Sequence, residues 1–420
     1  MEQKEFIKDY SFRFKKKFGQ NFIIDENILN NIVSSSKIDK NTLVIEVGCG
    51  AGALTKKLSK VAKRVIGYEI DESLRPILST IDADIIFSIN YYPALSEIAR
   101  VYKLLYYSWI VDAPVLELYS KTIKNRCNRV FIFDSELYKE ISVYNPYNIF
   151  YLPLAADCDF YQNAIRSASL ADVEKYTHNI SFVGSLYTEK CLYDKVKNLS
   201  SKISGYLHGI MKAQEKIYGY YFVEELLSDD VVNEFIKSYD GFYQSGEGDF
   251  LTEKRTLAQF YMGNKITAME RMDTFKRLSE KFQIDIYTAS DTNEIPKLRN
   301  HGTIMTHTQM PIVFNKSTIN LNTTSKPIRS GIPLRIFDLL ACGGFVLSNY
   351  QSDLLNDFVP GEELDIYSSL EELEEKIEYY LAHADICREI AYNGYEKVKK
   401  HHTYPIRLEQ MFRLGEHRKG

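Results

Sequence analysis

The feature that most constrains the fold is the stretch of residues 332–350, which reads IPLRIFDLLACGGFVLSNY. It predicts a loop, a short amphipathic helix, a turn at Gly343-Gly344 and an apolar strand, in that order. An α/β domain uses this succession to bring backbone close to a ligand at the carboxyl edge of its sheet. Arg335 and Asp338 are spaced to share one helix face. A guanidinium suits phosphate and a carboxylate suits ribose, so the pair indicates a nucleotide; a solvated surface pair is the alternative on spacing alone.

The composition is that of a globular protein of two or three domains. The chain has 420 residues, of which 45% are hydrophobic and 26% charged, with a net charge of -4. This balance gives no general reason to expect nucleic acid as a partner. The six cysteines are scattered without metal-ligand spacing, which favours reduced thiols in a cytoplasmic protein. The N-terminus has no apolar signal segment, and no apolar run is long enough to cross a bilayer.

The first residues form a basic arm and a leader helix, predicted over residues 1–38. Between Phe12 and Phe18, one arginine and three lysines are interleaved with phenylalanines. Such an arm can bind RNA through phosphate contacts and base stacking, and a solvated tail is the alternative.

The next segment predicts half of a dinucleotide or S-adenosylmethionine site. An apolar strand in LVIEVGCGAGALT leads into three closely spaced glycines and a helix, and a second strand ends at Glu69. The glycines admit a ligand to the backbone, and the carboxylate accepts ribose hydroxyls. The residues assigned to this site from the pattern are Glu46, Gly48, Gly50, Gly52 and Glu69.

With FGQNF upstream and YEID downstream, residues 1–80 closely resemble the N-terminal part of the 16S rRNA adenine dimethyltransferases. The resemblance implies that Gln20 and Asn21 lie near the cofactor. It ends after about Leu78, where that family continues with an adenine contact and a motif for the target base. Asn90-Tyr91-Tyr92-Pro93 comes too early and in the wrong order to supply that motif. We therefore expect S-adenosylmethionine binding as a remnant at most, without methyl transfer.

A different relationship begins near Asp84. WIVDAP, residues 109–114, resembles a segment of the CgeB-type spore-maturation glycosyltransferases, and the resemblance extends over residues 84–415. It implies a GT-B fold in which Arg335, Asp338 and the paired glycines bind a nucleotide-sugar donor. Asp112 closes a predicted strand, where it could orient an acceptor hydroxyl or act as its base; capping of the following turn is the alternative.

A second α/β unit opens with NISFVGSL, in which a strand runs into Gly184 and Ser185. A glycine there would let a diphosphate approach a following helix. About 95 residues separate this strand from the next, and their periodicity predicts a helical insertion at about 192–282. The loop before residue 332 carries Lys326 and Arg329, which could hold a diphosphate leaving group or lie solvated on the surface.

Together these features predict an α/β protein with two Rossmann-like domains of GT-B type, the second carrying the insertion. The expected boundaries are 39–165, with the methyltransferase-like unit at 39–80, and 166–420. The methyltransferase-like unit is expected to replace the first unit of the N-terminal sheet.

The predicted activity is sugar transfer from a nucleotide-diphosphate donor to an unknown acceptor, a glycan, protein or cell-surface polymer. No cofactor is expected to be required, and the assigned cations predict a metal-independent enzyme. The residues predicted to bind the nucleotide-sugar donor are Gly184, Ser185, Lys326, Arg329, Arg335, Asp338, Gly343 and Gly344. Two alternatives stay open: a truncated S-adenosylmethionine-binding protein related to rRNA methyltransferases, and a non-catalytic coat or binding protein of GT-B shape.

Overall fold

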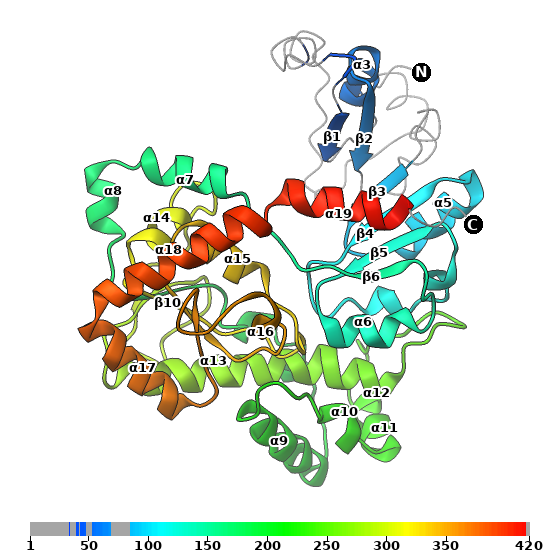
Figure 1. The fold of residues 1–420 in the computed structure, drawn as a ribbon. Coiled ribbons are helices and arrows are strands. Elements are labelled where there is room, and N and C mark those ends of the chain that lie inside the picture. Colours follow the sequence, from blue (N-terminus) through cyan, green and yellow to red (C-terminus); the bar gives the residue numbers. More distant parts are fainter. Residues whose placement is uncertain (1–32, 34–38, 42, 48–52, 69–84, 417–420) are drawn as a thin grey trace. The chain divides into compact units, whose positions relative to one another are not determined.

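The computed structural model describes residues 33, 39–41, 43–47, 53–68 and 85–416 (Figure 1). The chain divides into two compact units that interleave along the sequence. The first unit comprises Met1–Ile110, Lys121–Phe131 and Tyr144–Ile149, and the second comprises Val111–Ser120, Ile132–Val143 and Phe150–Gly420. The segments that follow three strands of the N-terminal sheet are therefore assigned to the second unit.

The first unit contains the predicted strand, helix and strand near the N-terminus. These are β1 (Leu43–Val47), α3 (Ala53–Val61) and β2 (Arg64–Tyr68). The two strands are parallel, with Leu43 opposite Arg64. Two parallel strands joined through one helix form the βαβ arrangement that the glycine-rich sequence predicts.

A separate four-stranded sheet follows, in the order β3-β4-β5-β6. Its strands are β3 (Ile85–Ile89), β4 (Leu105–Trp109), β5 (Asn128–Ile132) and β6 (Ile149–Tyr151). Among the described strands, β1 and β2 pair only with each other. β2 nevertheless contacts β3, and both belong to the first unit. The expectation that β1 and β2 replace the first unit of this sheet stays a prediction.

Short helices connect and follow these strands. They are α5 (Pro93–Tyr102), the 3-10 turns η3 (Leu116–Tyr119) and η4 (Lys121–Lys124), α6 (Ser135–Ser142), α7 (Cys158–Arg166) and α8 (Leu170–Lys175). The side chain of Asp134 caps α6 by accepting from the Leu137 amide at 2.8 Å.

The second unit is built on a six-stranded sheet in the order β12-β11-β10-β7-β8-β9. Its strands are β7 (Ile180–Val183), β8 (Asp285–Tyr287), β9 (Arg299–Asn300), β10 (Ile319–Asn322), β11 (Val346–Asn349) and β12 (Asp365–Tyr367). All five pairings are parallel. The strand order reverses between β7 and β10, so the crevice for a ligand is expected at the carboxyl ends of these two strands.

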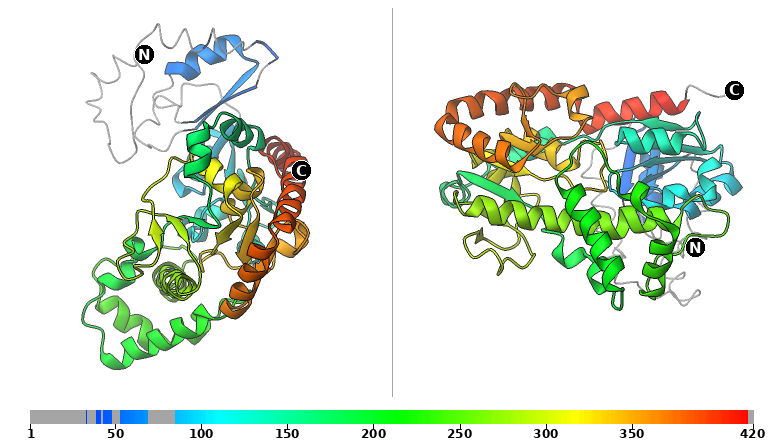
Figure 2. Two further views of the ribbon diagram at one scale, coloured as in Figure 1. Left: turned by 90° about the vertical axis from the view of Figure 1, so that its left-hand side faces the viewer. Right: turned by 90° about the horizontal axis from the view of Figure 1, so that it is seen from below.

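The helical insertion predicted between β7 and β8 is confirmed. It starts with the turns η5 (Thr188–Lys190) and η6 (Leu192–Lys195) and continues with α9 (Ser201–Glu215), α10 (Val223–Leu226), α11 (Asp229–Lys237), α12 (Glu253–Arg255), the π-helical η7 (Thr256–Met262) and α13 (Gly263–Ser279). α9 lies beside the long α13, whereas α10 contacts η7 and α11 contacts α12 (Figures 1 and 2). They enclose an apolar core of their own, including Leu207, Phe235 and Tyr261.

Six further helices belong to the described part of this unit. They are α14 (Met310–Lys316), α15 (Leu334–Ala341), α16 (Leu354–Asp357), α17 (Leu370–Ala382), α18 (Ala384–His401) and α19 (Tyr404–Glu416). The sheet core joins strand residues such as Ile180 and Leu347 to α17 and α18. Among the described residues, no helix combines the length and apolar character that a membrane span needs.

Candidate functional site

The carboxyl ends of β7 and β10 are joined by one buried guanidinium. Arg271, on α13, donates from Nη1 to the carbonyl oxygen of Ser185 and from Nη2 to that of Thr323. Ser185 lies directly after β7 and Thr323 directly after β10. The insertion therefore places a positive charge at the point where the strand order reverses.

Arg271 stays charged in this position although burial lowers its pKa. The guanidinium stacks on the ring of Tyr187, 4.8 Å from its centroid, and its buried Nε has no hydrogen-bond partner among the described residues. Next to it, the buried carboxylate of Glu270 pairs with the buried Nζ of Lys326 at 3.4 Å. Arg271, Lys326 and Glu270 together carry two positive charges and one negative charge, so the electrostatic field around them favours an anion.

Arg335 and Asp338 lie together at the beginning of α15, as their spacing predicts. The Arg335 side chain is 33% exposed, and its Nη1 lies 3.7 Å from Oδ2 of Asp338. The guanidinium lies over the ring of Phe314, on α14, and contacts the Met310 sulfur at 2.8 Å. Its charge also acts on Arg271. The arginine is thus held in place by a ring and a thioether while keeping donors for a ligand.

Asp338 is the more buried member of the pair. Its Oδ1 accepts a hydrogen bond of 2.8 Å from the hydroxyl of Tyr161, on α7. Burial raises the pKa of this carboxyl group. Its proposed contact with ribose stays a prediction.

Gly343 and Gly344 close α15, at the end opposite Arg335. Gly343 has a φ of +71°, and its amide donates to the Leu340 carbonyl at 2.9 Å. The Gly344 amide donates to the Leu339 carbonyl at 3.0 Å. Both amides are used to end the helix, which corrects the expectation that they donate to a ligand. A side chain at Gly344 would overlap the Phe314 carbonyl oxygen, so packing also requires this glycine.

Gly184 and Ser185 end β7 as predicted, but they do not begin a helix. The Gly184 amide donates to the Tyr287 carbonyl at 3.1 Å and so continues the ladder to β8. The next element is the three-residue turn η5. The expected helix N-terminus for a diphosphate is therefore wrong, and the Gly184 amide is already paired. The Ser185 hydroxyl donates to Glu189 at 2.6 Å.

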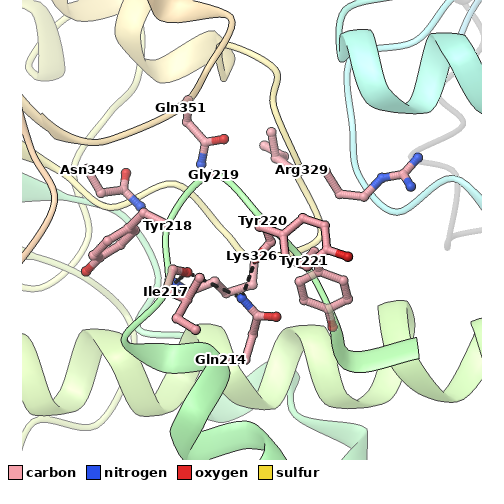
Figure 3. Close-up of a pocket in the computed structure, with 11 residues that line it drawn as sticks. Gln214, Ile217, Tyr218, Gly219, Tyr220, Tyr221, Lys326, Arg329, Asn349 and Gln351 are labelled. Carbon is pink, nitrogen blue, oxygen red and sulfur yellow. Dashed lines mark hydrogen bonds between the residues drawn. The ribbon is translucent and has the colours of Figure 1, made fainter. Parts of the chain in front are cut away.

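Lys326 and Arg329 line a polar pocket but are held by internal partners. The pocket lies between the segment after α9 and the loops after β10 and β11, with an empty volume of about 260 Å³ that includes open solvent (Figure 3). Nζ of Lys326 donates to the carbonyls of Glu215 and Ile217 at the end of α9. Arg329 points away from Lys326 and donates to Glu140, on α6, at 2.7 Å (Figure 3).

These contacts correct the expectation that Lys326 and Arg329 are free to neutralise a leaving group. Lys326 satisfies carbonyls that the last turn of α9 leaves without partners. The Arg329 amide donates to Oδ2 of Asp134 at 2.7 Å, so its backbone is fixed as well. Both residues hold the loop that precedes α15 in place.

The other predicted site residues are only partly described. Asp112 follows β4 and is exposed, and its role as a base stays a prediction. Glu46 lies on β1, whose backbone alone is described. The basic arm at 12–18 and the residues Gln20, Asn21, Gly48, Gly50, Gly52 and Glu69 lie outside the described residues.

Two family models match separate parts of the chain. Residues 270–413 match the family model described as glycosyl transferase-like. This match begins beside Arg271 and contains Arg335 and Asp338. Residues 11–84 match the model of ribosomal RNA adenine dimethylase.

A solved glycosyltransferase from Rickettsia africae ESF-5 has a similar fold, with a TM-score of 0.50 and 11% identity over 89% of this chain and 90% of that one. The fold is an α/β fold of GT-B type. The chain combines a glycosyl transferase-like region with a fragment similar to a different enzyme.

Two curated relatives are similar to the N-terminal fragment. Ribosomal RNA small subunit methyltransferase A of Lysinibacillus sphaericus is 55% identical over 74 residues, which are 18% of this chain and 25% of the relative. The protein of the same name from Staphylococcus aureus strain JH9 is 56% identical over 70 residues, 17% of this chain and 24% of the relative. The chain thus spans about a quarter of the length of these relatives. The predicted resemblance of residues 1–80 is confirmed.

Proposed function

We propose that the second unit binds a nucleoside diphosphate sugar at the carboxyl ends of β7 and β10 and transfers the sugar to an acceptor. The observation that carries this proposal is the bridge made by Arg271 between Ser185 and Thr323. It places a desolvated cation where a GT-B type fold has its ligand crevice. A diphosphate is the part of the donor that such a cation recognises.

In this proposal, Arg271 and Arg335 replace Lys326 and Arg329 as the cations that face the diphosphate. The acceptor hydroxyl attacks the anomeric carbon, and the bond from that carbon to the diphosphate oxygen breaks. The nucleoside diphosphate leaves with the bonding electrons, and the two guanidiniums stabilise its added charge. Asp112 takes the acceptor proton, and Asp338 accepts from the ribose hydroxyls. With guanidiniums in this role, we expect transfer without a metal ion.

The subgroup we propose is the CgeB-like one. The support is WIVDAP at residues 109–114, together with Arg335, Asp338 and the paired glycines. Its spore-related context and the acceptor class, a glycan, protein or cell-surface polymer, are part of the same proposal. A cytoplasmic location fits a donor made from nucleotides.

A second candidate function concerns the N-terminal fragment. Its 55% identity to rRNA methyltransferases over 74 residues favours retained affinity for S-adenosylmethionine or RNA. We propose no methyl transfer, because the remaining three quarters of those relatives have no counterpart in the match. Methyl incorporation into 16S rRNA by the purified chain would contradict this. A non-catalytic GT-B-shaped protein would bind a donor without turnover, so release of nucleoside diphosphate distinguishes it from an enzyme.

Titration of the full chain with nucleoside diphosphates and their sugars tests the main proposal. Arg335→Ala should raise the Kd for the preferred nucleotide by more than about tenfold, since a charge-assisted pair is lost. Arg388→Ala is the matched control, because Arg388 is an exposed arginine on α18. An unchanged Kd for Arg335→Ala, or an equal loss in the control, would remove the proposed role.

A further inference from the structure

A second group of chemistry-bearing side chains lies beside the amino-terminal half of β8. His178 precedes β7, Asp285 is the first residue of β8, and His301 follows β9. One potential ligand atom from each of the three lies within 4.8 Å of the other two. The candidate donor site is at the carboxyl ends of β7 and β10, so the two groups are distinct. No short sequence motif links these three residues, and only the sheet topology brings them together.

The carboxylate of Asp285 stands between the two imidazoles. Its Oδ1 lies 2.8 Å from Nε2 of His301, and its Oδ2 lies 3.5 Å from Nδ1 of His178. Ligand atoms around a tetrahedral zinc ion lie about 3.3 Å apart, given metal–ligand distances of about 2.0–2.2 Å. The two distances from Asp285 lie within about 0.5 Å of this value, and all three ligand atoms lie within 4.8 Å of one another. Side-chain movements that bring the two imidazoles onto one metal ion would complete the arrangement.

We propose that His178, Asp285 and His301 bind a zinc ion or a similar first-row transition metal. Two imidazoles and one carboxylate form a ligand set that zinc accepts, with water in the fourth position. The set is a poor one for magnesium or calcium, which take oxygen ligands. The metal replaces the protons that otherwise lie between the carboxylate and the rings.

The surroundings of the ligands support this assignment. The His178 ring is held from its other side, since Nε2 lies 2.8 Å from the hydroxyl of Tyr287. A metal on Nδ1 leaves Nε2 protonated, so it donates to Tyr287, the outer hydrogen bond that metal-bound histidines usually make. The ring of Tyr287 also stacks on His301 at 4.9 Å. The orientation of both histidines is therefore set before any metal arrives.

Access and charge set limits on this site. The His301 side chain is 37% exposed, whereas those of His178 and Asp285 are buried, so a metal enters from the side of His301. Arg299, on β9, brings a positive charge near His178 and opposes the cation. The single carboxylate of Asp285 must offset the charge of the metal ion and that of Arg299. We therefore expect an affinity weaker than that of a site with two acidic ligands.

Binding would join three segments at the edge of the sheet. β9 has two residues and pairs only with β8 among the described strands, which makes it a weakly held edge. A metal between Asp285 and His301 ties the end of β9 to β8, and His178 ties both to the start of β7. The role we assign is structural, independent of the proposed sugar transfer.

Titration of the tag-free, chelator-treated full chain with zinc chloride tests this proposal. We expect one zinc per chain at the site and a higher Tm with zinc than without. His301→Ala should raise the Kd by more than about 100-fold and abolish the shift in Tm, because a ligand is lost. Tyr287→Phe keeps every ligand and should raise the Kd by about 10- to 100-fold, since only the outer hydrogen bond is lost.

His307→Ala is the matched control, because His307 is an exposed histidine in the same loop as His301. It should bind zinc like the unaltered chain. The proposal is overturned if zinc does not bind, or if His301→Ala binds it with unchanged affinity. Equal affinity for magnesium would also contradict it, since the imidazoles would then have no part in the binding.

Discussion

Buried charged and titratable side chains decide most of the chemistry of this molecule at the scale of single residues. Arg271 and Lys326 are both buried cations, and each donates to main-chain carbonyl oxygens. Their functions differ through position: Arg271 lies at the strand-order reversal, and Lys326 at the end of α9. A cation with carbonyl acceptors keeps its charge and orients it, which makes Arg271 suited to an anionic ligand.

His402 provides a test of buried charge by pH. The ring packs against Phe337 and Phe358, and its Nδ1 accepts a hydrogen bond from Arg407. Burial, with the charge of Arg407, lowers the pKa of His402 to about 3. Below pH 6.5, His402 is protonated in the unfolded chain but stays neutral in the folded chain. The free energy of unfolding therefore falls as the pH falls towards 3. The expected loss is about 1.4 kcal/mol per pH unit.

Urea unfolding at pH 7 and pH 5 measures this contribution. His402→Asn keeps a hydrogen-bond acceptor for Arg407 and should reduce the loss between these pH values by about 2 kcal/mol. His208→Asn changes an exposed histidine on α9 and should leave the loss unaltered. The same acid loss in His402→Asn as in the unaltered chain would show that His402 does not cause it.

At the scale of elements, close helix packing holds the region around the candidate site. Gly394, on α18, lies against the Glu363 carbonyl and the Leu340 side chain, on α15. A Cβ at this position would overlap the carbonyl oxygen. α18 thus lies directly on the helix that carries Arg335 and Asp338, and a glycine allows the approach.

Two glycine-to-alanine substitutions separate packing from helix propensity. Gly394→Ala should lower the free energy of unfolding by about 1–3 kcal/mol, because backbone must move. Gly205→Ala, on α9, should raise it by about 0.5–1 kcal/mol, since a Cβ there has open space around it. Thermal or urea unfolding of both variants gives the comparison. Stabilisation by Gly394→Ala would contradict the packing described for α15 and α18.

Sequence patterns predict the strands and the insertion because burial imposes visible periodicities. The apolar runs at residues 180–183 and 346–347 are fully buried strands, and the helical period after Gly205 is the insertion. The hydrogen-bond partners of the Gly343 and Gly344 amides were mispredicted. Two glycines in a sequence indicate that a turn occurs there, but they do not indicate which acceptor the amides will have. Arg271 has no local signal, since its acceptors are distant in sequence. The same holds for His178, Asp285 and His301.

At the scale of the whole molecule, two segments of different resemblance share one chain. Residues 11–84 match an rRNA dimethylase and residues 270–413 a glycosyl transferase-like family. β1 and β2 form a two-stranded sheet of their own. The reversal of strand order between β7 and β10 in the six-stranded sheet therefore does not involve them. We therefore assign nucleotide binding to the second unit alone.

Hydrogen exchange of the full chain, with and without a saturating nucleoside diphosphate, tests that assignment most directly. We expect slower exchange in peptides that cover residues 184–190 and 323–338, because the ligand would lie at the carboxyl ends of β7 and β10. Peptides from residues 43–68 should exchange at unchanged rates. Protection confined to residues 43–68, with none after β7 and β10, would contradict the account.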